Sequence, residues 1–450
     1  MSYTLITSIK NISNILALLF LVCACNPTLI EIDDSQGVPG QTNAPISVQV
    51  QLNSKQITAA KEGRLGLVDL SVGNSNENII PVQLEKATDE TEQKIVFNFP
   101  AGAPGLRKFK IVESNSPFTV IMNASIDTKS AQHIITEGNK KVLQYNYQTV
   151  YEKDVLRPKS KKDVEMDFSN VEGIYYDEYL KAHPELEKNN TTTSSIYAIP
   201  RSDYIHPLYG LDGEMLTRDW PDGGHPHHRG IFWAWPEVEY GTKRGDLYAL
   251  QAVFARPTGN VEFTSGPVYA EINAENLWVW DEKVEIVREN AIIRVYHSIS
   301  DKRIIDLTIK LLALKDSVTI ATRFTNSYGG LNIRMQTPEL QDISYFTDNE
   351  RTTPLRAWSD FNGTFEGNQS KSGLMVLQHQ ENPEYPGAWR DYPDLAWVQP
   401  TFPTPDTRYK LSTEEQLVLR FRLINHSGGK PDKNTAEKNW DAYHNDATPR

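Results

Sequence analysis

Three histidines and two tryptophans lie close together in one short stretch, GGHPHHRGIFWAW, residues Gly223 to Trp235. Proline biases the residue before it toward extended backbone, so a rigid, non-helical backbone is expected here. His225 and His227 would then lie on one face and His228 on the other, with Arg229 back on the first. Because imidazole titrates near neutral pH and also binds metals, the stretch is a candidate for chemistry.

Three kinds of chemistry fit these residue types. Two histidines two positions apart on a strand can chelate a metal, but a zinc site needs a third protein ligand. A histidine and a carboxylate can act as general acid and base. Arg229 and a histidine could instead hold a substrate carboxylate, as a polysaccharide lyase requires. Histidines that only cap strand ends are the structural alternative. The whole group favours a functional site, for which we expect no metal and no other cofactor.

Aromatic and polar side chains recur elsewhere in a mixture that is typical of sugar-binding clefts. Trp233 and Trp235 could stack on a sugar ring, although at least one of them is expected in the core. The other candidate sugar-binding residues are His206, His225, Arg334, His379, Asn382, Trp389 and Arg390.

A glycoside hydrolase would also need two carboxylates about 5 to 10 Å apart. The candidates for this pair are Asp212, Glu214, Asp222, Glu237, Glu239, Asp246 and Glu339. A lyase would instead need Arg229 or Arg334 to hold a uronate. The sequence leaves hydrolysis and β-elimination both open.

Alternation of apolar and polar residues dominates the chain, for example in residues 46–52, 143–149, 305–311 and 318–324. This pattern predicts an all-β protein, an antiparallel β-sandwich or supersandwich with few short helices. One helix is expected in NTAEKNWDAYHN, capped by Asn434 or Thr435. A charged and polar segment, residues 152–195, is interpreted as an insertion or linker between a β-sandwich over 45–151 and a larger domain over 196–445.

The N-terminus predicts a lipoprotein of the cell envelope. An apolar run, Ile15 to Ala24, follows Lys10 and is too short to span a bilayer, so residues 1–24 are interpreted as a signal peptide. Cleavage before Cys25 would leave that residue as the lipid anchor in the outer membrane or facing the periplasm. Residues 25–44 would form a flexible tether. The net charge of −12 argues against nucleic acid as a partner.

The chain resembles a bacterial family often labelled PmoA-like or "methane oxygenase PmoA". The resemblance covers most of residues 45–445 and rests on YIHPLYGLDG, HPHHRGIFWAW, GGLNIRMQ, VLQHQENPEYPGAWRDY and EEQLVLRFRLINHSGG. PEVEYG and GDLYAL depart from the usual family pattern of a Gly-Asp-Val-Asn stretch and an Asp-Phe-Trp. The resemblance implies a secreted protein similar to galactose mutarotase-like supersandwiches. By that analogy His227 or His228 would be the acid and Glu339 the base.

The oxygenase label is not taken literally, because the mature chain lacks apolar membrane spans. The leading expectation is a carbohydrate-active enzyme, a hydrolase or lyase that acts on a poly- or oligosaccharide, with sugar epimerase the less favoured activity. The alternatives are a glycan-binding lipoprotein without catalysis and a structural protein of the envelope.

Overall fold

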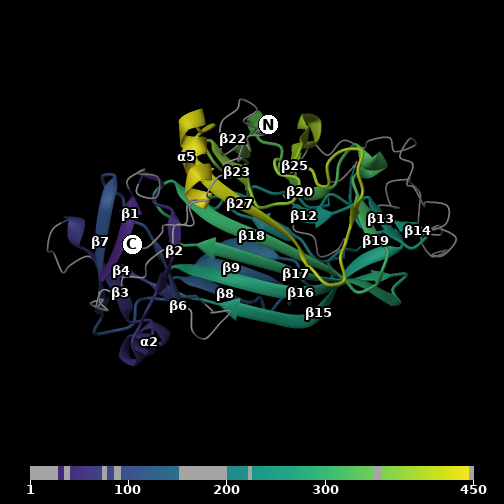
Figure 1. Ribbon diagram of the computed structural model, residues 1–450. Helices are drawn as coiled ribbons and strands as arrows, with labels where there is room; N and C mark the ends of the chain where they lie inside the picture. Colours follow the sequence, from purple (N-terminus) through teal and green to yellow (C-terminus); the bar gives the residue numbers. More distant parts are fainter. Residues whose placement is uncertain are drawn as a thin grey trace, which may run out of the picture.

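The computed structural model describes residues 29–34, 41–72, 79–85, 93–151, 200–220, 225–347 and 356–444. The predicted fold class is confirmed, because antiparallel sheets dominate and the helices are few and short. A smaller N-terminal domain packs against one end of a large β-sandwich (Figure 1). The described helices include none with the length and apolar character needed to cross a membrane. The expected signal peptide, Cys25 and the segment 152–195 lie outside the described residues.

The N-terminal domain consists of two small sheets around an apolar core. The first contains, in spatial order, β1 (Leu29–Asp34), β7 (Gly105–Glu113), β3 (Leu65–Asp69) and β4 (Ile80–Pro81). The second contains β2 (Pro45–Val50), β6 (Gln93–Asn98) and β5 (Gln83–Leu84). Helix α2 (Ser54–Lys61), with a capping box between Asn53 and Gln56, and the 3₁₀ turn η1 (Leu70–Val72) complete the domain.

Part of the expected tether over residues 25–44 is a strand, which corrects that prediction. Residues Leu29–Asp34 form β1, paired with β7 along its full length. The sequence LIEIDD alternates, and Ile30 and Ile32 are buried in the domain core. Two branched apolar side chains on one strand face account for the ordered pairing.

The large sandwich consists mainly of two eight-stranded sheets. The "first large sheet" contains, in spatial order, β24 (Trp389–Tyr392), β25 (Trp397–Pro400), β20 (Gly330–Arg334), β12 (Ile231–Ala234), β11 (Ile205–Leu208), β10 (Lys140–Tyr145), β9 (His133–Glu137) and β8 (Met122–Ile126). The "second large sheet" contains β15 (Val253–Thr264), β16 (Tyr269–Trp280), β17 (Val284–Tyr296), β18 (Lys302–Ala313), β27 (Leu417–Ser427), β23 (Ser372–Gln378), β22 (Ala357–Thr364) and β21 (Glu339–Thr347).

A smaller sheet and two 3₁₀ turns complete this domain. The sheet contains β14 (Lys243–Gly245), β13 (Glu237–Tyr240), β19 (Val318–Ala321) and β26 (Tyr409–Lys410), and the turns are η4 (Arg323–Thr325) and η5 (Pro393–Leu395).

The division between the domains differs from the predicted one. Strands β8, β9 and β10 belong to the first large sheet, where β10 pairs with β11, so the large domain begins before residue 122 and not after the segment 152–195. The backbones of Val150 and Arg201 also hydrogen-bond to each other, at 2.9 and 3.3 Å. Alternation in residues 143–149 predicts a strand but does not say which strand it pairs with, which explains the error.

Strand register separates the side chains of each large sheet into an inner and an outer face. In the first large sheet, Trp233 and Ile333 point into the apolar core between the two sheets. Arg334 belongs to the opposite, outer face, because successive side chains alternate. In the second large sheet Ile293 and Leu307 point into the same core, so their neighbours Arg294 and Asp306 lie on its outer face.

The predicted C-terminal helix is confirmed as α5 (Lys433–His444), which packs on the outer face of the second large sheet (Figure 1). Trp440 is fully buried and its indole N–H donates to the carbonyl of Gln378 at 3.1 Å. The Asp432 carboxylate accepts the Thr435 N–H at 2.7 Å, so the capping side chain precedes the two residues that were predicted.

Candidate functional site

The three histidines of the HPHHRG motif lie against one another. The ring centroids of His225 and His228 are 4.7 Å apart, those of His227 and His228 are 4.7 Å apart, and those of His225 and His227 are 5.6 Å apart. The His228 N–H donates to the His225 carbonyl at 2.8 Å. The backbone therefore turns here, whereas an extended strand with the imidazoles on two faces was expected.

Two aromatic rings border these imidazoles. Trp397 stacks on His228 with the centroids 6.1 Å apart, and Tyr248 lies edge-on to His227 and His228 at 5.6 and 5.7 Å. We call His225, His227, His228, Arg334, Tyr248 and Trp397 the "imidazole–arginine cluster". It lies on the outer face of the first large sheet.

Arg334 supplies the positive charge of this cluster. It stands opposite Trp397 in the pairing of β20 with β25, and its side chain is 5% exposed. Its Nε and Nη1 have no hydrogen-bond partner, and no described carboxylate forms an ion pair with it. Burial, and next the charge of Arg218, lower the pKa of Arg334 to about 9.

The histidines of the cluster are neutral at pH 7. Burial, and next the charge of Arg334, lower the pKa of His225 to about 4. Burial also holds the pKa values of His227 and His228 well below the usual value, and the neighbouring imidazoles add to this effect. Neutral imidazoles suit proton acceptance or hydrogen bonding rather than the acid role that the mutarotase analogy implied.

Among the predicted carboxylates that the structure describes, Asp246 lies beside the cluster, two residues before Tyr248, whereas the predicted Asp222 lies outside the described residues. It is 2% exposed and accepts the Ala249 N–H at 2.8 Å, while Arg323 Nη1 lies 3.5 Å from its other oxygen. Burial raises the pKa of Asp246 to about 7, although the Ala249 N–H and Arg323 both oppose this shift. A carboxyl group of this kind can both donate and accept a proton near neutral pH.

Arg229, predicted as a catalytic residue, is a structural residue in the interior. Its side chain is fully buried, its Nε donates to Asp219, and its Nη2 donates to the Tyr204 hydroxyl at 2.6 Å. The guanidinium also lies 4.4 Å from the ring centroid of Trp220. Its charge is therefore satisfied within the fold.

Trp233, Trp235 and His206 also lie in the interior rather than in a sugar cleft. The Trp233 indole donates to Glu289 Oε1 at 2.8 Å, and the Trp235 indole donates to the Phe402 carbonyl at 2.7 Å. Both tryptophans are at most 1% exposed, and the imidazole of His206 is hydrogen-bonded to Thr217 at 3.0 Å.

The remaining predicted residues do not gather at one place. Asn382 holds the backbone of Arg420 through two hydrogen bonds of 2.7 and 2.8 Å. Arg390 donates to the Asn326 carbonyl at 2.7 Å, and Trp389 is half-buried on β24. Glu339 lies exposed at the start of β21 in the second large sheet. Within the described part of the chain, none of these residues has a recorded contact with the imidazole–arginine cluster.

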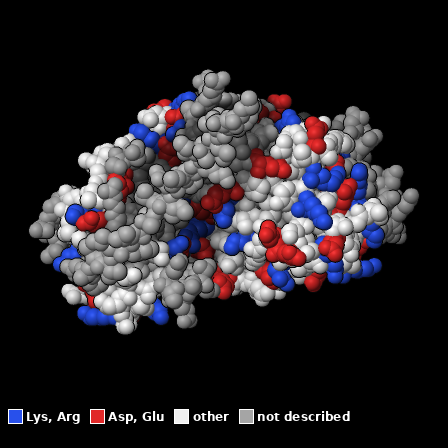
Figure 2. Space-filling model, in the orientation of Figure 1, with Lys and Arg blue, Asp and Glu red and all other residues white. Residues whose placement is uncertain are grey.

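His379 lines a separate cavity of about 470 Å³ between the N-terminal domain, the outer face of the second large sheet and α5. We call it the "interdomain cleft". The space-filling view shows acidic and basic side chains side by side in a hollow at this place (Figure 2). The sequence interpretation missed the cleft, although its lining includes charged residues of β16, β17 and β18, namely Glu271, Arg294, Asp306 and Lys310.

No group of three or more His, Cys, Asp or Glu side chains among the described residues is arranged to hold a metal ion. In particular, the three adjacent imidazoles do not form such a group.

A family model described as "Family of unknown function (DUF6807)" matches residues 190–441. The matched range contains every residue of the imidazole–arginine cluster, whereas the N-terminal domain lies outside it. No curated protein matches the chain.

Proposed function

Because the chain belongs to the DUF6807 family, whose function is unknown, we propose a function from its own side chains. It is a carbohydrate-active protein that binds an acidic poly- or oligosaccharide at the imidazole–arginine cluster and cleaves it by β-elimination. The observation that carries this proposal is the state of Arg334, whose guanidinium is buried without a carboxylate partner among the described residues.

A buried cation without a counter-ion destabilises a fold, typically by several kcal/mol. Arg229 shows the usual solution, because Asp219 neutralises it. Arg334 has no such partner among the described residues, so the anion that it fits is one supplied by a ligand. The planar guanidinium matches a carboxylate through two parallel hydrogen bonds, and a uronic acid carries that group.

The aromatic rings around Arg334 are the reason for choosing a sugar as the carrier of the carboxylate, because an indole or phenol face packs well against the C–H face of a pyranose. Trp397 and Tyr248 are at most 2% exposed and already pack against His228, so a pyranose would reach their faces only after these rings move apart. The Trp397 Nε1 also has no hydrogen-bond partner among the described residues, but it is buried and would reach a sugar hydroxyl only after the same movement.

The protonation states favour elimination over hydrolysis. In β-elimination from a uronate, the proton next to the carboxylate leaves to a base, a C=C bond forms, and the bond to the glycosidic oxygen breaks. Arg334 would stabilise the charge that develops on the carboxylate, and a neutral imidazole of His227 or His228 would accept the proton. Asp246, with a pKa of about 7, is the candidate that returns a proton to the leaving oxygen.

This assignment departs from the roles that the mutarotase analogy implied. The histidines act as bases rather than acids, and Glu339 has no part because it lies exposed at the start of β21. A hydrolase would require a second carboxylate about 5 to 10 Å from Asp246.

The test is digestion of uronic acid-containing glycans by the full mature chain, followed through the ultraviolet absorbance of unsaturated sugar ends. We expect absorbance to rise with the wild type and to stay flat with His228→Ala and with Arg334→Met. New reducing ends without absorbance would identify a hydrolase instead. Binding that needs Arg334 without any cleavage would support the alternative, a glycan-binding lipoprotein. No binding of any acidic glycan would refute the proposal.

We further propose that the protein is a lipoprotein anchored through Cys25 in the cell envelope, in the outer membrane or facing the periplasm. The support is the apolar run Ile15 to Ala24 directly before Cys25. Labelling of the full chain with a fatty acid in a bacterial host should be lost in Cys25→Ser. Equal labelling of both proteins would contradict the anchor.

A further inference from the structure

The interdomain cleft contains a regular ladder of opposite charges. Glu271, Arg294, Asp306 and Arg422 stand directly opposite one another on β16, β17, β18 and β27, so acidic and basic side chains alternate across four strands. The Asp306 carboxylate accepts two hydrogen bonds from Arg422, at 2.7 and 2.8 Å, and Arg294 donates to Glu271 at 2.6 Å.

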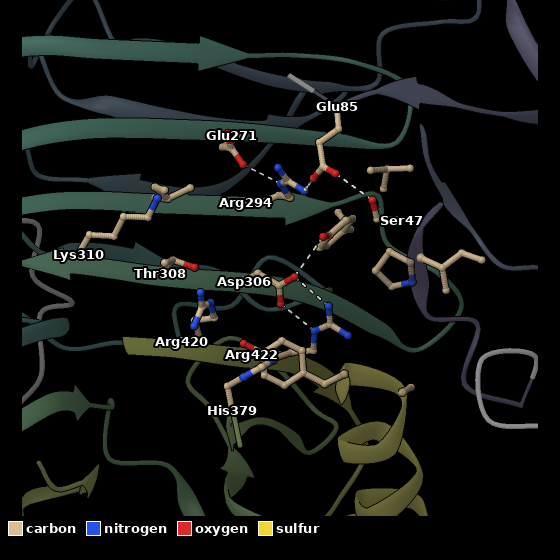
Figure 3. A pocket seen from close by; sticks show the side chains of 17 residues that line it. Ser47, Glu85, Glu271, Arg294, Asp306, Thr308, Lys310, His379, Arg420 and Arg422 are labelled. Atoms are coloured by element: carbon tan, nitrogen blue, oxygen red, sulfur yellow. Dashed lines mark hydrogen bonds and ion pairs between the residues drawn. The ribbon is translucent and has the colours of Figure 1, made fainter. Parts of the chain in front are cut away.

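The N-terminal domain contributes one more carboxylate to this ladder. Glu85 forms an ion pair with Arg294 and accepts the Ser47 hydroxyl at 2.8 Å (Figure 3). The three carboxylates that line the cleft, Glu85, Glu271 and Asp306, are therefore all engaged by Arg294 or Arg422.

Two further cations of the cleft lack a comparable partner. Lys310 forms no ion pair with a described residue. Arg420 lies 3.5 Å from Glu381, a carboxylate that is 66% exposed and therefore well screened by solvent. The lining thus has four cationic against three acidic side chains, in a protein whose net charge is −12.

Lys310 and Arg420 are both neighbours of Thr308 on the outer face of the second large sheet. Thr308 stands opposite Arg420 across the β18–β27 pair, and Lys310 follows on the same face two residues later. Opposite residues in such a pair have their Cβ atoms about 5 Å apart, so the three side chains can reach a common point. Figure 3 shows them together at the end of the cleft that is remote from Glu85 and Ser47.

We propose that the interdomain cleft is a second ligand site, which binds the oxyanion of a charged sugar through Lys310, Thr308 and Arg420. An ammonium group, a hydroxyl and a guanidinium all donate hydrogen bonds to a carboxylate, a sulfate ester or a phosphate ester. The volume of about 470 Å³ lies within the range of small-molecule sites, about 300 to 1,000 Å³. The ion-paired ladder then supplies fixed donors and acceptors for sugar hydroxyls.

This site is independent of the proposed elimination. The imidazole–arginine cluster lies on the outer face of the first large sheet and the interdomain cleft on the outer face of the second, with the apolar core between them. A ligand bound in the cleft could be a part of the same glycan or a different molecule.

The test is titration calorimetry of the full mature chain with glucuronic acid, glucose 6-sulfate, glucose 6-phosphate and, as the neutral reference, glucose. We expect at least one charged sugar to bind more tightly than glucose, with an affinity that falls as salt is added. The charged sugar that binds best identifies the oxyanion. Equal or undetectable binding of all four sugars would overturn the proposal.

Three variants locate the binding. Lys310→Met with Arg420→Met should weaken the charged sugar about tenfold or more, whereas Lys315→Met, an exposed lysine outside the cleft, should not. Arg334→Met should leave unchanged the part of this binding that the double variant removes. If Arg334→Met abolishes it and the double variant does not, the sugar binds at the imidazole–arginine cluster and the cleft proposal is wrong. Melting temperatures establish that each variant is folded.

Discussion

Arg334 on β20 and Trp397 on β25 face each other across neighbouring strands, and both have buried nitrogens that no described residue accepts a hydrogen bond from. A guanidinium and an indole N–H on one sheet face are thus two donors without acceptors in the described part of the chain. Buried donors of this kind destabilise a protein unless something supplies the missing acceptors. A ligand that supplies acceptors to Arg334 and Trp397 should therefore raise the stability of the fold.

Arg334 and Arg229 are predicted to respond in opposite ways to replacement by methionine. Arg229→Met leaves Asp219 buried and unpaired, so the free energy of unfolding should fall by about 3 to 5 kcal/mol. Arg334→Met removes a buried charge that no described carboxylate pairs with, so the free energy of unfolding should stay the same or rise by about 1 to 2 kcal/mol. Denaturant unfolding of both variants measures the difference. A large loss of stability in Arg334→Met would mean that this arginine is also a structural residue.

Asp246 should determine the pH dependence of turnover near neutrality. Its pKa of about 7 predicts a limb of the pH–rate profile centred there. Asp246→Asn keeps an acceptor for the Ala249 N–H but cannot exchange a proton, so we expect turnover to fall about 10²-fold or more and that limb to disappear. The measurement is the rate of elimination from pH 5 to 9. An unchanged profile would remove Asp246 from the mechanism.

His133 should make the fold sensitive to mild acid. Burial lowers the pKa of His133 to about 4, whereas in the unfolded chain its pKa is near 6.5. Between these values the unfolded state binds the extra proton, so the free energy of unfolding falls as the pH drops from 6.5 toward 4. Replacement by phenylalanine should preserve the stacking on Tyr147, where the centroids are 4.7 Å apart.

Chemical denaturation at pH 7 and pH 5 checks this effect. The wild type should lose about 1 to 2 kcal/mol more between these pH values than His133→Phe loses. Equal losses in the two proteins would show that His133 does not contribute to the acid response.

Glu289 should be essential to the core because it accepts hydrogen bonds from two indoles. Trp233 and Trp278 donate to its two oxygens at 2.8 and 2.7 Å. Glu289→Ala leaves both N–H groups without an acceptor, which should lower the free energy of unfolding by about 2 to 5 kcal/mol. Glu289→Gln keeps one acceptor oxygen and should lose less. Thermal unfolding of the two variants tests the order, and equal stability would contradict the role of these hydrogen bonds.

The alternating pattern predicted the all-β class and several strands correctly, because alternation follows directly from the geometry of a half-buried strand. The same pattern could not assign β10 to the first large sheet, since its partner β11 follows only after residues 152–199. The C-terminal helix was recognisable because Trp440 lies on its apolar face.

The sequence alone could not show that Arg334 and Arg229 have different roles. Both arginines adjoin apolar strand segments, and the difference is that the chain brings Asp219 to Arg229 and no described carboxylate to Arg334. The motif HPHHRG did locate three members of the cluster. Tyr248 and Trp397 were not singled out, because a tyrosine or a tryptophan within an apolar stretch is most often a core residue.

The backbone contact between Val150 and Arg201 should allow the large domain to tolerate changes in the chain between these two residues. The two residues are far apart in the sequence, and their backbones are already joined by hydrogen bonds. Whatever length of chain connects them, the strands on either side keep their register. A new pair of chain ends could therefore be opened between them, or another domain inserted, without altering either large sheet.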